Sequence, residues 1–414
     1  MSQSIRFHTL DNGLVLVAEE MRWLESAAFT LLVPGGCVYD PRGHEGLSGL
    51  VCEMALRGAG PRNSRQFVEA LDNLGVQRGE SVSDAHTSFS GATLSRSLPE
   101  ALEIYADVVR RPHLPADQLE AGRQVALQEV QSVEDDPHHK VMLELRRRLY
   151  PPPWGRPSQG SRQGLQSITL DDVRDQHRRL YRPNGMILGV AGAIDWSALK
   201  DQVAKLFGDW QPSEDPALKT QKGPPAKAHL EHKTNQTHIG VAYSSVPYRD
   251  PNYFNAWAAV GALSGGMSSR LFTEVREKRG LCYSVYASYH TLRDQAGVLC
   301  YSGTSADRAQ QTLDVLLAEL HRLSKGVEPS ELQRLKARMK SSIMMQQESS
   351  SSRSGAVARD WYHLQRVRTL DEVGAIVDAL TCEGINAYLA QHPPDDFRVV
   401  TLGPEPLEVR VGVS

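Results

Sequence analysis

The sequence of 414 residues lacks several features that would place a protein in a broad class at once. No segment approaches about 18 consecutive apolar residues, so the sequence predicts no membrane-spanning helix. The net charge of −3 gives no electrostatic reason to expect nucleic acid or an anionic membrane as a partner. The five cysteines are scattered and odd in number, which favours reduced thiols over a disulfide framework. The nucleotide-binding patterns G-x-G-x-x-G and G-x-x-x-x-G-K-[ST] are also absent.

The N-terminal residues run directly into a strand pattern. Residues 1–10 contain no apolar signal core, so we expect a cytoplasmic protein, or a periplasmic one if a leader has been removed. Asn12-Gly13 precedes the β-rich run 14–18 and predicts a hairpin turn. Helix patterns cover residues 64–74, 98–110 and 116–150, and further strand patterns cover 27–33 and 87–94. We expect Ser64 to cap the first helix and Asp136-Pro137 to interrupt the last.

A polar segment divides the chain almost in half. Residues 211–225 hold four prolines and show no periodicity, which is typical of a linker. Short patterns recur on its two sides at an offset of about 210 residues, and a constant offset indicates a duplicated unit. The sequence therefore predicts two homologous α+β domains, residues 1–210 and 226–414, each with a mostly antiparallel sheet covered by helices on one face. The serine-rich run 348–353 is typical of a loop or a frayed helix turn.

One stretch of the first half resembles a metal-binding helix. Residues 46–59, Gly-Leu-Ser-Gly-Leu-Val-Cys-Glu-Met-Ala-Leu-Arg-Gly-Ala, resemble the zinc-binding helix of the M16 family (pitrilysin, insulinase and mitochondrial processing peptidases). In that family the helix carries H-x-x-E-H, whose two His bind zinc while the Glu acts as the general base. Here Gly49 and Glu53 stand at the His positions, and Cys52 stands at the Glu position. The resemblance therefore implies two M16-type domains with a degenerate zinc motif in the first.

The third ligand position of the family is retained. That ligand is a Glu about 76 residues after the second His, and Glu129 lies 76 residues after Glu53. Gly122 stands where a further acidic residue is usual. A substitute metal site of Cys52, Glu53 and Glu129 is one alternative, but adjacent helical residues project about 100° apart and converge poorly on one ion. The other alternative, which we favour, is a buried thiol beside two solvated carboxylates with no metal bound.

The second half carries a positive motif. Residues 265–286, Gly-Gly-Met-Ser-Ser-Arg-Leu-Phe-Thr-Glu-Val-Arg-Glu-Lys-Arg-Gly-Leu-Cys-Tyr-Ser-Val-Tyr, closely resemble the second domain of bacterial M16B peptidases. There an Arg and a Tyr seven residues later reach the zinc site of a first-type domain, and Arg276 and Tyr283 match that spacing and context. Arg279 and Tyr286 share the spacing, so the assignment depends on the family frame. The alternative is a solvated helix face with a packed Tyr.

The resemblance implies a non-catalytic subunit of a heterodimeric zinc peptidase. A homologous partner with an intact H-x-x-E-H would hold the zinc, while this chain would bind no cofactor and would lend Arg276 and Tyr283 to the partner's site. Preorganised donors aimed at the developing oxyanion lower the barrier to peptide hydrolysis. The substrate would be an unfolded peptide added to a sheet edge, for which residues 87–94 are the candidate. A structural core-type subunit, a self-sufficient peptidase with a non-standard metal, and a homodimer in isolation stay open.

Overall fold

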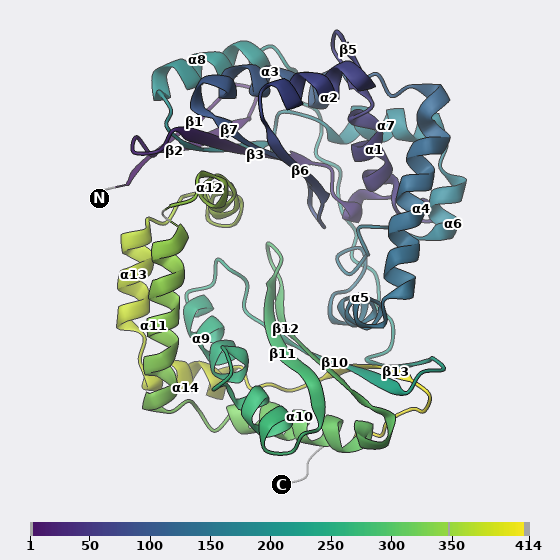
Figure 1. Ribbon diagram of the computed structural model, residues 1–414, viewed down its shortest axis with the longest axis vertical. Coiled ribbons are helices and arrows are strands. Elements are labelled where there is room, and N and C mark those ends of the chain that lie inside the picture. Colours follow the sequence, from purple (N-terminus) through teal and green to yellow (C-terminus); the bar gives the residue numbers. More distant parts are fainter. Residues whose placement is uncertain (1–2, 347, 410–414) are drawn as a thin grey trace. The chain divides into compact units, whose positions relative to one another are not determined.

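The computed structural model describes residues 3–346 and 348–409, which form two compact units (Figure 1). Unit 1 comprises Met1–Gln131, Arg156–Lys219 and Met344–Leu370, and unit 2 comprises Ser132–Gly155, Thr220–Ile343 and Asp371–Ser414. Each unit is therefore built mainly from one half of the chain and takes a segment from the other half. The domain boundaries at 210 and 226 stay a prediction.

Unit 1 contains a six-stranded sheet in the order β1-β2-β8-β3-β7-β6. Its strands are β1 (Ser4–Thr9), β2 (Val15–Glu20), β8 (Ile187–Gly192), β3 (Ser26–Pro34), β7 (His86–Leu94) and β6 (Gln77–Val82). Only β2 and β8 pair in parallel, and the other neighbours are antiparallel. The hairpin predicted at Asn12-Gly13 joins β1 to β2, and Gly13 adopts the left-handed φ of +88° that such a turn requires.

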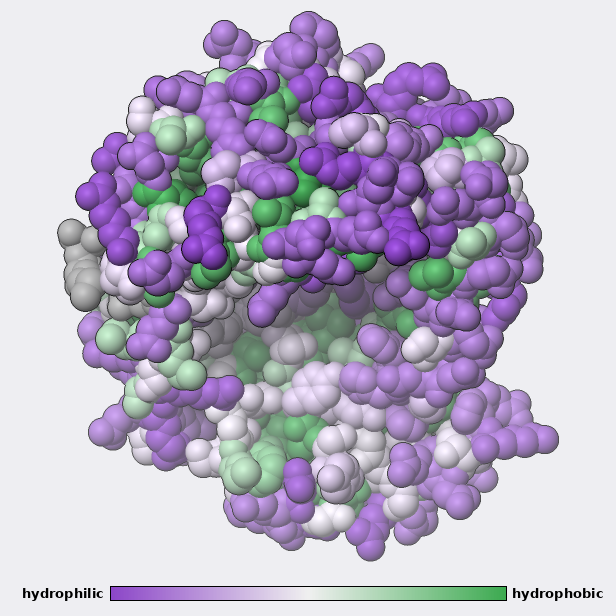
Figure 2. All heavy atoms as spheres, turned by 45° about the horizontal axis from the view of Figure 1, so that its top comes forward, coloured by the Kyte–Doolittle hydropathy of each residue, from purple (hydrophilic) through white to green (hydrophobic). Residues whose placement is uncertain are grey.

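Helices cover one face of this sheet and complete the core of unit 1. Among them, α2 (Ser64–Asn73), α3 (Leu98–Arg110) and α8 (Trp196–Phe207) present a mainly hydrophilic outer surface (Figure 2). The predicted helix over 98–110 is confirmed because its buried stripe, including Tyr105, packs on Phe29 and Phe89 of the sheet. Ser64 is not the cap of α2. The preceding Asn63 accepts from the Gln66 N–H at 3.0 Å, and Gln66 bonds back to the Asn63 N–H.

A single helix from the second half of the chain covers the opposite face of the unit 1 sheet (Figure 1). This helix, α12 (Ser350–Leu364), packs Val357 and Trp361 on Val17 and Ile187. Arg353 on α12 donates to the Glu19 carboxylate on β2 at 2.6 Å, and both side chains are at most 4% exposed. The serine-rich run was expected to form a loop or a frayed turn. Its first two residues precede α12, but residues 350–353 form the first turn of that helix, in which Ser350 and Arg353 are buried.

Unit 2 repeats the arrangement with a five-stranded sheet in the order β11-β12-β10-β13-β9. Its strands are β11 (Cys282–Thr291), β12 (Ala296–Ser305), β10 (Gln236–Ser245), β13 (Arg398–Gly403) and β9 (Lys227–Glu231), and only β13 and β9 are parallel. The main core of unit 2 includes α9 (Tyr253–Ser264), α10 (Ala309–Leu323) and α14 (Cys382–Gln391).

A helix from the first half of the chain packs on this second sheet through a separate cluster. The helix predicted over 116–150 is interrupted as expected, into α4 (Leu119–Asp135) and α5 (Pro137–Leu149), and the Asp136 side chain caps α5 by accepting from the His138 N–H at 2.9 Å. Val141 and Leu145 of α5 pack on Ala242, Leu299, Val400 and Leu402. The predicted α+β fold with antiparallel-rich sheets is confirmed, and the structure adds a helix on the second face of each sheet.

The structure corrects the choice of sheet edge. Residues 87–94 lie inside the unit 1 sheet, because β7 pairs with β3 on one side and with β6 on the other. The edge beside them is β6, whose sequence Gln-Arg-Gly-Glu-Ser-Val holds a single β-branched residue and was not predicted as a strand. In the described part of the chain, no helix combines the length and the apolarity that crossing a lipid bilayer requires.

Candidate functional site

The degenerate motif forms α1 (Leu47–Ala55), whose first turn is held by a buried carboxylate. Asp40 accepts from the Gly46 N–H at 2.8 Å, the Ser48 N–H at 2.9 Å and the Ser48 hydroxyl at 2.6 Å. Burial raises the pKa of Asp40 to about 6, although these hydrogen bonds oppose the shift. Gly49 offers no ligand, and an added Cβ there would have only the Ser158 carbonyl oxygen near it, at 3.7 Å. The helix itself is therefore formed, but Gly49, at the first His position of the motif, has no side chain that could bind a metal.

Cys52 behaves as an apolar residue. Its side chain lies in the core of unit 1 and the residue is 6% exposed. Burial raises the pKa of the Cys52 thiol, and the carboxylates of Glu80, Glu53 and Glu129 raise it further. A metal ligand or a nucleophile must be a thiolate. Cys52 is therefore held in the protonated form that suits neither role.

The carboxylate of Glu53, which stands at the second His position of the motif, forms an ion pair with Arg57. Glu53 Oε1 accepts from Arg57 Nε at 3.0 Å and from Arg57 Nη2 at 2.7 Å, one helical turn further along. Burial raises the pKa of the Glu129 carboxyl, and the nearby Glu53 adds to the shift. Gly122 lets α4 approach α1 closely, because an added Cβ would lie 3.0 Å from the Met54 sulfur and 3.4 Å from Arg57 Nε. An acidic side chain at that position would displace these neighbours.

These residues do not fit a hydrolytic zinc ion. Such a site needs three deprotonated protein ligands around one open position. At α1, one ligand position is a glycine, the thiol is protonated, and the Glu53 carboxylate is neutralised by Arg57. Within residues 3–346 and 348–409, no group of three or more His, Cys, Asp or Glu side chains is arranged to hold one metal ion.

Arg276 and Tyr283 lie together on the surface of unit 2. Arg276 belongs to a π-helical segment, Phe272–Glu277, and its guanidinium carbon lies 4.9 Å from the Phe272 ring centroid and 5.4 Å from that of Tyr283. A β-bulge between Cys282 and Ser284 leaves Tyr283 out of the β11–β12 register, and Tyr283 is 86% exposed. Among the described residues, no carboxylate forms an ion pair with Arg276. The cationic group and the phenol are thus available to a ligand.

Arg279 and Tyr286, which have the same spacing of seven residues, have hydrogen-bond partners within the chain. Arg279 Nη1 donates to the Glu274 carbonyl oxygen and to its Oε2, both at 2.7 Å. Tyr286 is half-buried, and its hydroxyl lies 2.6 Å from His138 Nε2 on α5. The structure therefore separates an internally satisfied pair, Arg279 and Tyr286, from the exposed pair formed by Arg276 and Tyr283.

Comparison with known proteins connects both regions to one family. Residues 16–152 match the family model described as "Insulinase (Peptidase family M16)", and residues 167–339 match the one described as "Peptidase M16 inactive domain". Together the two models cover more than half of the chain. The chain belongs to the M16 peptidase family. The first matched region contains α1, and the second contains the Arg276–Tyr283 segment.

Relatives cover almost the whole M16 chain. The uncharacterized zinc protease YmxG of Bacillus subtilis is 28% identical over 409 residues, 97% of this chain and 98% of its own. An uncharacterized zinc protease of Rickettsia felis is 24% identical over 388 residues, 93% of this chain and 94% of its own. A peptidase M16 inactive domain structure from Pseudomonas fluorescens has a TM-score of 0.87 at 23% identity, covering 99% and 100% of the two chains. A Helicobacter pylori protease structure has a TM-score of 0.89 at 20% identity, covering 98% and 100%.

The structure also adds two residues that the sequence analysis did not single out. Arg57 neutralises Glu53, and its spacing of four residues from Glu53 on a helix is a signal that could have shown the pairing. Glu80 on the edge strand β6 lies near Cys52 and accepts from the Tyr105 hydroxyl at 3.2 Å. The position of Glu80 depends on the packing of β6 against α1, which the sequence did not reveal because β6 was not predicted.

Proposed function

We propose that this chain is the non-catalytic subunit of a two-chain M16 zinc peptidase, in which a homologous partner with an intact H-x-x-E-H binds the zinc. One contrast supports the proposal most. At α1 the zinc-binding groups are replaced by a glycine, a protonated thiol and a carboxylate already held by Arg57. On unit 2, Arg276 and Tyr283 are exposed and adjacent.

The exposed pair has the chemistry that the partner's reaction needs. Hydrolysis of a peptide bond places negative charge on the carbonyl oxygen, and a Tyr hydroxyl can donate to that oxygen. Arg276 offers a planar fork of donors for a carboxylate or for peptide carbonyl oxygens. The ring of Tyr283 lies beside the Arg276 guanidinium, and this contact orients both groups without consuming their hydrogen-bond donors.

The substrate in this proposal is an unfolded peptide that adds to the free edge of β6. β6 pairs only with β7 among the described strands, so its outer edge presents unpaired backbone groups. It packs against α1 and carries Gly79 and Glu80. Backbone pairing at a sheet edge binds peptides with little dependence on sequence. This edge replaces residues 87–94, which the structure places inside the sheet.

Reconstitution tests the proposal. The chain is purified alone and together with an M16 chain that carries H-x-x-E-H, and cleavage of a fluorogenic unfolded peptide is measured. We expect cleavage by the mixture and none by this chain alone. Arg276→Ala in the mixture should abolish most of the activity, whereas the matched control Arg279→Ala, on the same segment but paired with Glu274, should retain it.

Two results would refute this function. Zinc-dependent cleavage by the isolated chain would show a self-sufficient peptidase. Full activity of a mixture that contains Arg276→Ala would show that the chain serves its partner only as a structural subunit, because a scaffold makes no use of the exposed guanidinium.

A further inference from the structure

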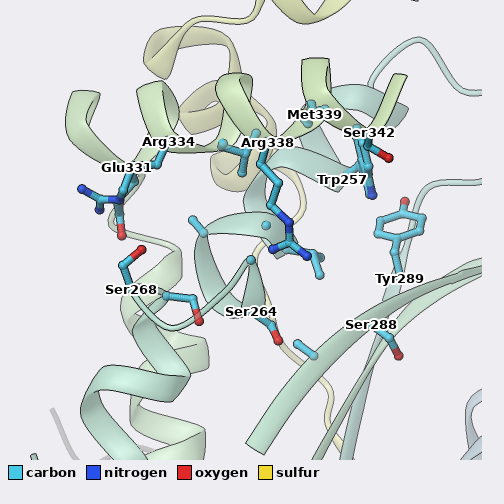
Figure 3. Close-up of a pocket in the computed structure, with 17 residues that line it drawn as sticks. Trp257, Ser264, Ser268, Ser288, Tyr289, Glu331, Arg334, Arg338, Met339 and Ser342 are labelled. Atoms are coloured by element: carbon cyan, nitrogen blue, oxygen red, sulfur yellow. The ribbon is translucent and has the colours of Figure 1, made fainter. Parts of the chain in front are cut away.

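Unit 2 contains a cavity of about 320 Å³ that the proposed function does not use. It lies between α9, α11 (Pro329–Gln346) and β11, beside the Gly265-Gly266 turn that ends α9 (Figure 3). One part of its wall is apolar and is formed by Trp257, Val260, Ala287, Leu335 and Met339. The other part is polar and includes Ser264, Ser268, Ser342, Arg334 and Arg338. The cavity wall therefore mixes apolar side chains with guanidinium and hydroxyl groups.

Two arginines line the cavity from the same helix. Arg334 and Arg338 are one helical turn apart on α11, and no carboxylate in residues 3–346 or 348–409 forms an ion pair with either. Two like charges at this spacing repel each other. Two other basic groups of this region are paired with carboxylates. Lys340 meets Asp378 at 2.5 Å, and Arg270 binds both oxygens of the cavity residue Glu331 at 2.7 Å.

The Gly265-Gly266 turn leaves room for the Arg338 side chain. Figure 3 shows Arg338 reaching from α11 across the cavity toward the turn, and an added Cβ at Gly265 would lie 3.3 Å from its Nη1. Gly266 adopts a φ of +144°, which L side chains rarely accept. The hydroxyls of Ser264, Ser268 and Ser342 have no hydrogen-bond partner among the described residues. Ser268, Ser342 and both arginines are exposed to solvent, so the cavity presents these donors to an incoming ligand.

We propose that this cavity binds the C-terminal residue of a peptide, with the α-carboxylate on the Arg338 guanidinium beside Gly265 and an apolar side chain against Trp257 and Leu335. A volume of about 320 Å³ is more than a bare inorganic anion requires, since one water occupies about 30 Å³ of liquid. An arginine fork suits a planar carboxylate, and the charge of the cavity is complementary to it.

The end strand of the sheet favours a peptide over other anions with an apolar tail. β11 pairs only with β12 among the described strands, and Ala287, Ser288 and Tyr289 of β11 line the cavity. The outer edge of β11 therefore offers backbone groups next to the carboxylate site. This proposal deepens the proposed function by naming a substrate class, peptides with a free, apolar C-terminus, but the site belongs to unit 2 alone. It can therefore fail or hold independently of cleavage.

Calorimetric titration of the full chain without any partner tests the site. The probe is acetyl-Ala-Ala-Ala-Leu with a free carboxylate, and its C-terminal amide is the matched ligand. A charge-assisted hydrogen bond lost on amidation corresponds to roughly 10- to 100-fold weaker binding. We expect the acid to bind at least about tenfold more tightly than the amide. Arg338→Gln should reduce this acid-to-amide ratio to within about twofold of unity.

The matched control is Lys340→Gln on the same helix, whose charge is paired with Asp378 outside the cavity. It should leave the ratio unchanged. Because the readout is a ratio of two ligands on one protein sample, a partly unfolded variant does not mimic the effect. Equal binding of acid and amide by the unaltered chain would overturn the proposal, and so would an equal loss in Arg338→Gln and Lys340→Gln. Binding of decanoate or inorganic phosphate as tight as that of the peptide acid would overturn the assignment to a peptide terminus.

Discussion

The buried ion pair between Arg353 and Glu19 gives a quantitative test of how the two halves of the chain are joined in unit 1. Arg353 lies on α12, from the second half, and Glu19 lies on β2, from the first. Both side chains are at most 4% exposed, and Glu19 also accepts from Gln3 Nε2 at 2.6 Å. Arg353→Met replaces the aliphatic stem of the Arg but leaves the Glu19 carboxylate buried with one neutral donor.

The expected cost follows from that unpaired charge. Removing one partner of a buried ion pair destabilises a protein by about 3–5 kcal/mol, whereas replacing both partners by apolar residues is often nearly neutral. Arg353→Met should therefore lower the free energy of unfolding by about 3–5 kcal/mol. The double variant Glu19→Met/Arg353→Met should recover most of this loss. The control Arg65→Ala breaks an exposed pair with Glu69 and should change stability by less than about 1 kcal/mol.

Urea unfolding followed by far-ultraviolet circular dichroism measures these differences. The decisive observation is the order of stabilities, with the single variant below the double one. A loss of less than about 1 kcal/mol in Arg353→Met would refute the reasoning. A double variant less stable than Arg353→Met would refute it as well, because the cost would then come from lost packing of α12 rather than from a stranded charge.

Three further predictions concern pH, the thiol and metal. Burial lowers the pKa of His177 and of His290 to about 4, so the unfolded chain binds more protons between pH 4 and 6.5. Stability should therefore fall as pH drops through this range, and His177→Gln should flatten the slope in urea unfolding. Cys52 should resist iodoacetamide in the native chain while the half-buried Cys382 reacts, as read by peptide mass spectrometry, because burial holds Cys52 as a thiol. Zinc should not raise the melting temperature of this chain, whereas a ligand at 100 times its Kd would stabilise it by about 2.7 kcal/mol.

Local patterns allowed much of the fold to be predicted. The helix over 98–110 and the break at Asp136-Pro137 follow from apolar spacing and from proline chemistry within a few residues. The cap of α2 differs by one residue because Asn63 and Ser64 are both good caps, and Gln66 selects Asn63 through a reciprocal bond. Strand β6 was not predicted because its sequence is polar and has little strand propensity. Pairing with β7, rather than propensity, makes this segment a strand.

Long-range packing could not be predicted from local patterns. Nothing within the serine-rich run of α12 indicates burial, since its partners on β2, β3 and β8 lie more than 150 residues away in the sequence. The identity of the residues at the degenerate zinc positions was readable, but their electrostatic state depends on Glu80 and on burial. The cationic cavity in unit 2 likewise joins α9, α11 and β11 and has no sequence signature of its own.

The most direct test of the central claim, that this chain supplies a donor to a reaction on another chain, is the turnover of the reconstituted pair with Tyr283→Phe. This change removes one hydroxyl from a residue that is 86% exposed, so it should alter neither folding nor the affinity for the partner. We predict that kcat falls by about 10²–10³, the cost of one lost oxyanion donor, while the Kd of the two chains is unchanged. An unchanged kcat, with the pair fully assembled, would contradict the account.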